Sequence, residues 1–137
     1  NGADRGATEA RIAELLTSFD LTTYANWRAG DLPYGRKRAL ELAATMATDP
    51  QVMLLDEPTQ GLGFEDVERV ADLIKTIGTS RTVLMVEHNM SLVSRIADRI
   101  TVLRSGAIIA DGDYDTVSRD PQVVEAYLGS GRRRARH

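Results

Sequence analysis

Two adjacent carboxylates, Asp56 and Glu57, come directly after the apolar run at residues 52–55, and Pro58 ends the run. A strand at 52–55 would deliver both acids to the carboxyl edge of a sheet, where ligands bind in open α/β folds. In that position one acid could hold Mg²⁺ on a nucleotide while the other orients a water at the γ-phosphate. The alternative is a polar turn in which Asp56 bonds its own backbone.

A second apolar run, at residues 82–86, also ends in polar residues, because Glu87, His88 and Asn89 follow it. A histidine can donate to a phosphate oxygen from one ring nitrogen while a neighbour holds the other nitrogen. A histidine at the end of a strand can also simply bond to the backbone.

The start of a helix is a third place for chemistry, and Gly35 lies there in the run Leu32-Pro33-Tyr34-Gly35-Arg36-Lys37-Arg38. The free N–H groups of a helix N-terminus favour phosphate, and a glycine lets the backbone approach a ligand closely. The alternative is an ordinary glycine at a helix start. The three basic residues that follow could add positive potential or form a solvated face.

The spacing of apolar residues predicts the elements that position these groups. Thr8 is the expected N-cap of a first helix with apolar positions from Ile12 to Phe19, and residues 20–34 read as a loop. Pro33 lets the next helix start only at or after its own position, and that helix should stop before residues 49–50. The other predicted elements are a helix at 64–77 closed by Gly78, a short helix at 91–97, a hairpin of 99–103 with 107–110, and closing helices at 115–118 and 121–128.

The alternation of strands and helices through the middle of the chain predicts an α/β fold, a mainly parallel sheet flanked by helices. Two such strands are too few for a complete doubly wound fold, so we expect the carboxyl-terminal part of a larger domain. The first residue is Asn1 rather than methionine, which is typical of the middle of a longer polypeptide, and residues 1–6 read as a linker.

Composition excludes several classes of function. The 137 residues contain no cysteine, which rules out thiolate chemistry and disulfides, and no apolar run approaches the ~20 residues that a membrane helix needs. Four arginines lie in the predicted disordered basic tail at 130–137, and without them 13 basic residues face 20 acidic ones, a charge of about −7. The body is therefore not a nucleic-acid surface.

Residues 61–66 form a fourth motif, a turn that leads into the predicted helix at 64–77. Taken in order, the four motifs resemble those of the nucleotide-binding subunits of ABC transporters over nearly all of residues 7–129. Residues 32–38 resemble the signature motif and 52–58 the Walker B strand, while 61–66 resemble the D-loop and 86–89 the switch-histidine loop. The resemblance implies the C-terminal part of a P-loop NTPase (ABC ATPase) domain. Residues 7–48 would be the C-terminal part of its helical subdomain, and 49–129 the C-terminal part of its RecA-like core.

The resemblance also implies roles for residues at the strand ends. Asp56 corresponds to the residue that holds Mg²⁺ through water, and Glu57 to the general base for the attacking water. His88 corresponds to the residue that senses the γ-phosphate. ATP and Mg²⁺ are therefore the expected cofactors.

Four signature residues, Pro33, Tyr34, Gly35 and Arg36, correspond to the surface that meets the nucleotide bound by the opposite subunit, and Gly63 belongs to the D-loop. Proline stands here for the usual serine, tyrosine for the first glycine and arginine for glutamine, so the serine contact to phosphate is missing. Gly63 replaces the usual aspartate of the D-loop.

Pro33, Tyr34 and the closing segment at 120–129 resemble the ATPase subunits of branched-chain amino acid importers, although urea importers and lipopolysaccharide exporters share a similar ending. The implied partners are a second ATPase subunit in a head-to-tail dimer and transmembrane permease subunits, at the cytoplasmic face of the inner membrane. No nucleic-acid partner is expected. Two alternatives remain: an ABC ATPase that transports nothing, and a non-catalytic interaction module.

A phosphate-binding loop, Gly-x-x-x-x-Gly-Lys-Ser/Thr, does not occur in the sequence. The nearest approach, at residues 30–37, has arginine and lysine at its last two positions and no strand before it. We therefore expect this chain alone to bind ATP weakly or not at all, and to be inactive as an enzyme.

Overall fold

A computed structural model describes residues 2–128; residue 1 and residues 129–137, including the predicted basic tail, lie outside the described part. The chain divides into two compact units, Asn1–His88 and Asn89–His137.

The first unit begins with the helix α1, Gly2–Ser18, and two short 3₁₀ turns lead from it to the helix α2, Tyr34–Ala47. α1 starts well before the expected N-cap Thr8, so residues 2–6 are helical where a linker was predicted. These residues contain no proline, and Arg5 pairs with Glu9 one turn later, so nothing in the sequence stops the helix there. The start of α2 directly after Pro33 confirms the prediction from the proline.

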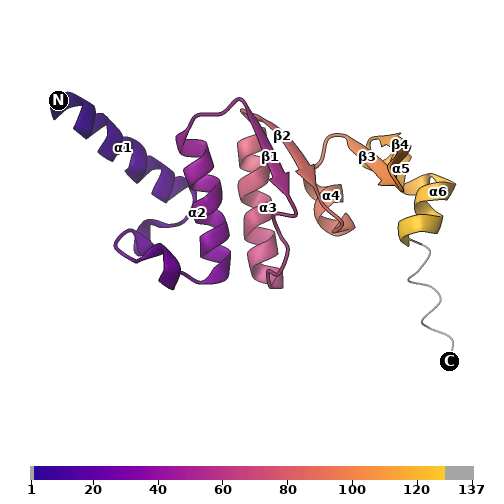
Figure 1. The fold of residues 1–137 in the computed structure, drawn as a ribbon, viewed down its shortest axis with the longest axis horizontal. Helices are drawn as coiled ribbons and strands as arrows, with labels where there is room; N and C mark the ends of the chain where they lie inside the picture. The colour runs from indigo at the N-terminus through magenta and orange to yellow at the C-terminus, as the bar shows by residue number, and fades with distance from the viewer. Residues whose placement is uncertain (1, 129–137) are drawn as a thin grey trace. The chain divides into compact units, whose positions relative to one another are not determined.

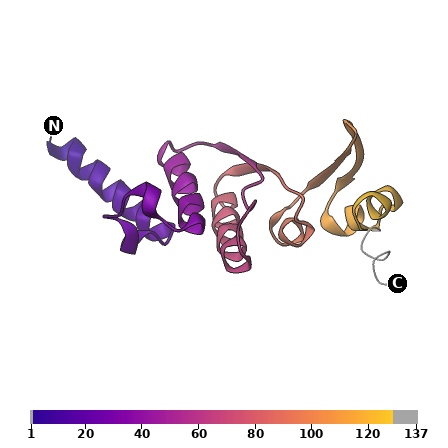
Figure 2. The same ribbon diagram turned by 60° about the horizontal axis from the view of Figure 1, so that its bottom comes forward.

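A strand–helix–strand segment follows, made of β1, Val52–Asp56, α3, Phe64–Gly78, and β2, Thr82–Val86. The two strands are parallel, and their register pairs Val52 with Thr82 and Asp56 with Val86. α3 lies beside α2 and against the strands (Figures 1 and 2). The helical spacing predicts an apolar stripe of five residues on α3; Val67 is half-buried, and the other four are buried, namely Val70, Ala71, Ile74 and Ile77.

The sheet has one covered face and one exposed face. Met53 is only 1% exposed, whereas its neighbour Leu54 is 73% exposed and points to the opposite side. Leu84 pairs with Leu54 and is 63% exposed. The continuous apolar runs at 52–55 and 82–86 are typical of buried strands, and this expectation is wrong for the face of Leu54, because within the described chain helices cover only the side of Met53.

The second unit begins with α4, Met90–Ile96, which Asn89 caps by accepting a hydrogen bond from the Leu92 amide. β3, Ile100–Arg104, and β4, Ala107–Gly112, form the predicted antiparallel hairpin, and both turn residues, Ser105 and Gly106, have positive φ. The unit closes with α5, Tyr114–Arg119, α6, Pro121–Val123, and a π-helical turn, Val124–Leu128. From residue 2 to residue 128, no helix is both long and apolar enough to cross a membrane.

The two faces of β1 can be compared by truncating neighbouring residues. Met53→Ala should lower the free energy of unfolding by about 2–5 kcal/mol, because it leaves a cavity under the sheet. Leu54→Ala, the matched control on the exposed face, should change it by less than about 0.5 kcal/mol. Urea unfolding of both variants measures the difference, and equal losses would show that the Leu54 face is covered.

Candidate functional site

The polar ends of β1 and β2 meet at one edge of the sheet. Asp56, the last residue of β1, pairs in register with Val86, the last residue of β2. The Glu57 amide then donates to the Val86 carbonyl at 2.9 Å, so the strand pairing continues one residue beyond β1. Parallel pairing therefore places the two predicted acids beside the residues that follow β2.

Glu57 and His88 form a direct contact at this edge. Nδ1 of His88 lies 3.2 Å from Oε1 of Glu57, with 70% of the histidine side chain and 36% of the glutamate side chain exposed. Glu57 has a φ of 44°, a left-handed conformation that costs a non-glycine residue roughly 1–2 kcal/mol. Such strained residues cluster at functional sites because the surrounding structure must hold them.

Glu87 and Thr59 are functional candidates that sequence reasoning missed. Oε1 of Glu87 accepts hydrogen bonds from the Thr59 hydroxyl at 2.5 Å and from the Thr59 amide at 3.1 Å. Oε2 of Glu87 accepts a bond from the His88 amide at 3.2 Å. Thr59 is buried, at 6% exposure. The contact follows from the strand register, and the sequence signals only that Thr59 follows Pro58 after the first apolar run and that Glu87 directly follows the second.

Gly35, at the start of α2, is buried against the carboxylate of Asp66 in the first turn of α3. A Cβ atom at Gly35 would overlap this carboxylate, which is itself held by Arg69 at 2.5 Å. The space that Gly35 leaves beside the backbone is therefore filled by the Asp66 side chain of the same unit. Its predicted contact with a phosphate stays a prediction.

Two of the three basic residues of the signature-like motif, Arg36 and Arg38, are engaged within their own unit. Arg36 donates to the Asp20 carboxylate at 2.6 Å and lies over the ring of Tyr24. The hydrogen bond and charge of Arg36 lower the pKa of Asp20, and the hydrogen bond from Arg36 to Asp20 raises the pKa of Arg36. Arg38 pairs with Glu41 at 2.8 Å.

Tyr34 and Gly63 differ in how much their surroundings constrain them. Tyr34 is half exposed, and its ring lies under the guanidinium of Arg38. Gly63 caps α3 with an ordinary φ of −71°, and no atom lies within 4 Å of the position of an added Cβ. The backbone therefore does not require glycine at this D-loop position.

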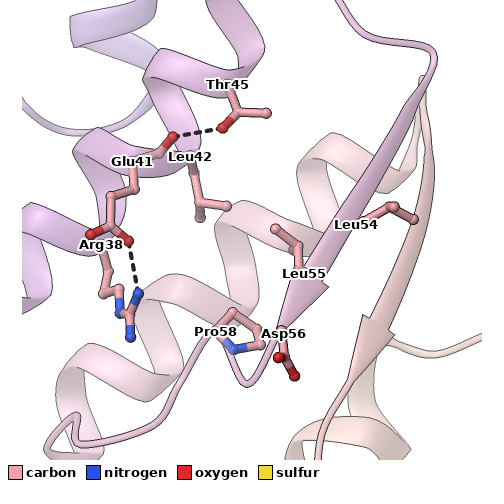
Figure 3. A pocket seen from close by; sticks show the side chains of 8 residues that line it. All are labelled: Arg38, Glu41, Leu42, Thr45, Leu54, Leu55, Asp56 and Pro58. Atoms are coloured by element: carbon pink, nitrogen blue, oxygen red, sulfur yellow. Dashed lines mark hydrogen bonds and ion pairs between the residues drawn. The ribbon is translucent and has the colours of Figure 1, made fainter.

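A cavity of about 200 Å³ lies between α2 and the end of β1 (Figure 3). Its lining combines apolar side chains with charged ones, namely Arg38, Glu41, Leu42, Thr45, Leu54, Leu55, Asp56 and Pro58. Asp56 is exposed at the rim, where the strand ends. Nε of Arg38 is buried, and no hydrogen-bond partner lies within the described residues.

Metal binding by the protein alone finds no support in the part of the chain that the structure describes. No three histidine, aspartate or glutamate side chains there gather closely enough to hold an ion. Mg²⁺ commonly binds through one or two carboxylates together with waters and substrate phosphates, so a lone exposed Asp56 fits that mode.

Comparisons with known proteins match both ends of the chain. A family model described as "ABC transporter" matches residues 2–60, and one described as "Branched-chain amino acid ATP-binding cassette transporter" matches residues 107–132. The high-affinity branched-chain amino acid transport ATP-binding protein BraF of Pseudomonas aeruginosa is 41% identical over 119 residues, which are 85% of this chain and 47% of BraF. LivG of Escherichia coli, of the same description, is 38% identical over 129 residues, which are 91% of this chain and 51% of LivG.

Among solved structures, the ADP conformation of MJ1267, an ATP-binding cassette of an ABC transporter, aligns with a TM-score of 0.77 and 26% identity. The alignment covers 88% of this chain and 49% of that one. The α/β fold is thus that of an ATP-binding cassette ATPase. The chain belongs to the ABC transporter ATP-binding family, and it spans about half the length of the curated relatives it matches.

The contact between Gly35 and Asp66 can be tested with a coupled pair of substitutions. Gly35→Ala should lower the free energy of unfolding by about 1–3 kcal/mol, because the new methyl group meets a carboxylate held by Arg69. Asp66→Ala in the same chain should recover part of this loss.

Urea unfolding measures both effects. Gly30→Ala is the matched control, since nothing lies within 4 Å of its added Cβ, and it should change stability by less than about 0.5 kcal/mol. Equal losses for Gly35→Ala with and without Asp66 would show that the two residues do not interact.

Proposed function

We propose that this sequence is part of an ATP-binding and ATP-hydrolysing subunit of an ABC importer for branched-chain amino acids. The observation that carries the proposal is the contact of Glu57 with His88 at the shared edge of β1 and β2. The names of BraF and LivG support the transported solute, and both proteins are about twice as long as this chain.

In this proposal Glu57 accepts a proton from, or orients, the water that attacks the γ-phosphate. His88 holds Glu57 through Nδ1, and a ring that carries protons on both nitrogens would also donate from Nε2 to a phosphate oxygen. Phosphoryl transfer depends mainly on positioning and on charge stabilisation, so a carboxylate fixed in one orientation suffices. Asp56 would hold Mg²⁺, which supplies positive charge against the phosphates when it is bound.

The partners in this proposal are a second ATPase subunit and transmembrane permeases. A head-to-tail dimer would bring the start of α2, with Pro33, Tyr34, Gly35 and Arg36, to the nucleotide of the other subunit, and Gly63 near it. Nη1 of Arg36 donates to the backbone oxygen and to the carboxylate of Asp20, so we expect this residue to act mainly in shaping the loop before α2. The subunit would work at the cytoplasmic face of the inner membrane, with no nucleic acid.

The lack of a phosphate-binding loop in this sequence leads to a prediction about the chain alone. It presents the metal and water groups without the backbone amides that cradle phosphates, so its ATP affinity should be weaker than about 1 mM. Isothermal titration calorimetry of the 137-residue chain with ATP and Mg²⁺ measures this affinity. Micromolar binding would contradict the prediction.

The role of Glu57 can be tested in an ATPase that carries this sequence. Glu57→Gln should reduce ATP turnover by about 10²–10⁴-fold and leave ATP binding intact, because the amide cannot accept a proton from water. Glu14→Gln, which removes an exposed carboxylate from α1, is the charge-matched control and should keep normal turnover. Turnover that is unchanged in Glu57→Gln would remove Glu57 from this role.

A further inference from the structure

The two strand ends are joined by a closed ring of contacts that includes more than the Glu57–His88 pair. Starting at Glu57, the backbone runs through Pro58 to Thr59, and Thr59 donates its hydroxyl and its amide to Glu87. Glu87 precedes His88 and accepts the His88 amide, and the His88 ring returns to Glu57. All of these residues belong to the first unit.

The chemistry of this ring requires a carboxylate at position 87. Both oxygens of Glu87 accept hydrogen bonds, one from two groups of Thr59 and the other from the His88 backbone. Hydrogen bonds to an ionised acceptor are about twice as strong as neutral ones. A glutamine in its place would turn an N–H group toward one of these donors, so at least one amide would lose its acceptor.

Glu57 is the residue most in need of such support. Its positive φ is unfavourable, and the exposed His88 ring has freedom to rotate away. The buried Thr59 fixes the chain two residues after Glu57, and Glu87 ties that fixed point to the backbone of His88.

We propose that Glu87 is a positioning residue, which with Thr59 holds His88 and Glu57 in their 3.2 Å contact. This inference rests on the ATPase function proposed above, and it adds a carboxylate that acts through its contacts with Thr59 and His88. Glu87 acts through His88, so its effect on hydrolysis disappears when His88 is absent.

The first experiment is a double-mutant cycle in the ATPase that carries this sequence. Glu87→Gln should lower kcat by about tenfold to a hundredfold and leave the KM for ATP within about threefold, because it misplaces catalytic groups without removing them. In a His88→Ala background, the same change should alter kcat by less than about twofold. If the loss of kcat in the double variant equals the product of the two single losses, Glu87 and His88 act independently, and the proposal is overturned.

Variants at Thr59 separate positioning from general destabilisation. Thr59→Ser keeps the hydroxyl group and should keep normal kcat. Thr59→Val keeps the shape of the side chain but loses the hydroxyl group, so it should lower kcat by about as much as Glu87→Gln does. Glu14→Gln again serves as the charge control, and melting temperatures show that each variant is folded. Loss of kcat in Thr59→Ser equal to that in Thr59→Val would overturn the role of the hydroxyl bond.

A second measurement does not depend on ATP hydrolysis. In the 137-residue chain, Glu87→Gln should speed amide hydrogen exchange at His88 or Thr59 by about tenfold, since one of these amides loses a charged acceptor. Unchanged exchange at both amides would overturn the proposal. If the unaltered ATPase and its Glu57→Gln variant hydrolyse ATP at the same rate, the proposed function fails. The exchange data would still decide whether Glu87 holds Thr59 and His88 together.

Discussion

The pairing of β1 with β2 is the interaction on which the rest of the candidate site depends. Its register places Asp56 beside Val86, and one further hydrogen bond, from the Glu57 amide to Val86, carries the pairing past the end of β1. Every polar contact described at this edge follows from that alignment. A shift of one residue would turn each side chain of the strand to the opposite face and separate Glu57 from His88.

Negative charge is concentrated at the edge of the sheet where we propose that an anionic nucleotide binds. Asp56, Glu57 and Glu87 lie at one edge, and Asp66 lies against the start of α2. Carboxylates orient water and hold cations well, but they repel phosphate, so binding energy must come from elsewhere. Arg36 and Arg38 do not supply it in this arrangement, because their guanidinium groups pair with Asp20 and Glu41.

Pattern in the sequence was enough to locate the strands, the start of α2, the stripe of α3 and the hairpin, because each depends on local spacing or on a proline. The resemblance of the motifs selected Glu57 and His88, and the structure brings these two side chains into contact, while their catalytic roles stay predictions. The exposure of Leu54 was not predictable, since an apolar run does not reveal what covers it. The contacts of Asp66 with Gly35 and of Glu87 with Thr59 depend on helix packing and strand register, which a single sequence leaves open.

The crossover through α3 has a consequence for how this site forms during folding. Glu57 and His88 are 31 residues apart in sequence, so their contact requires a long loop to close. Helices such as α2 and α3 make local contacts and form early, whereas parallel strands joined by a crossover pair late. We therefore expect the contact between Glu57 and His88 to form after the helices of the first unit, when the two strands dock.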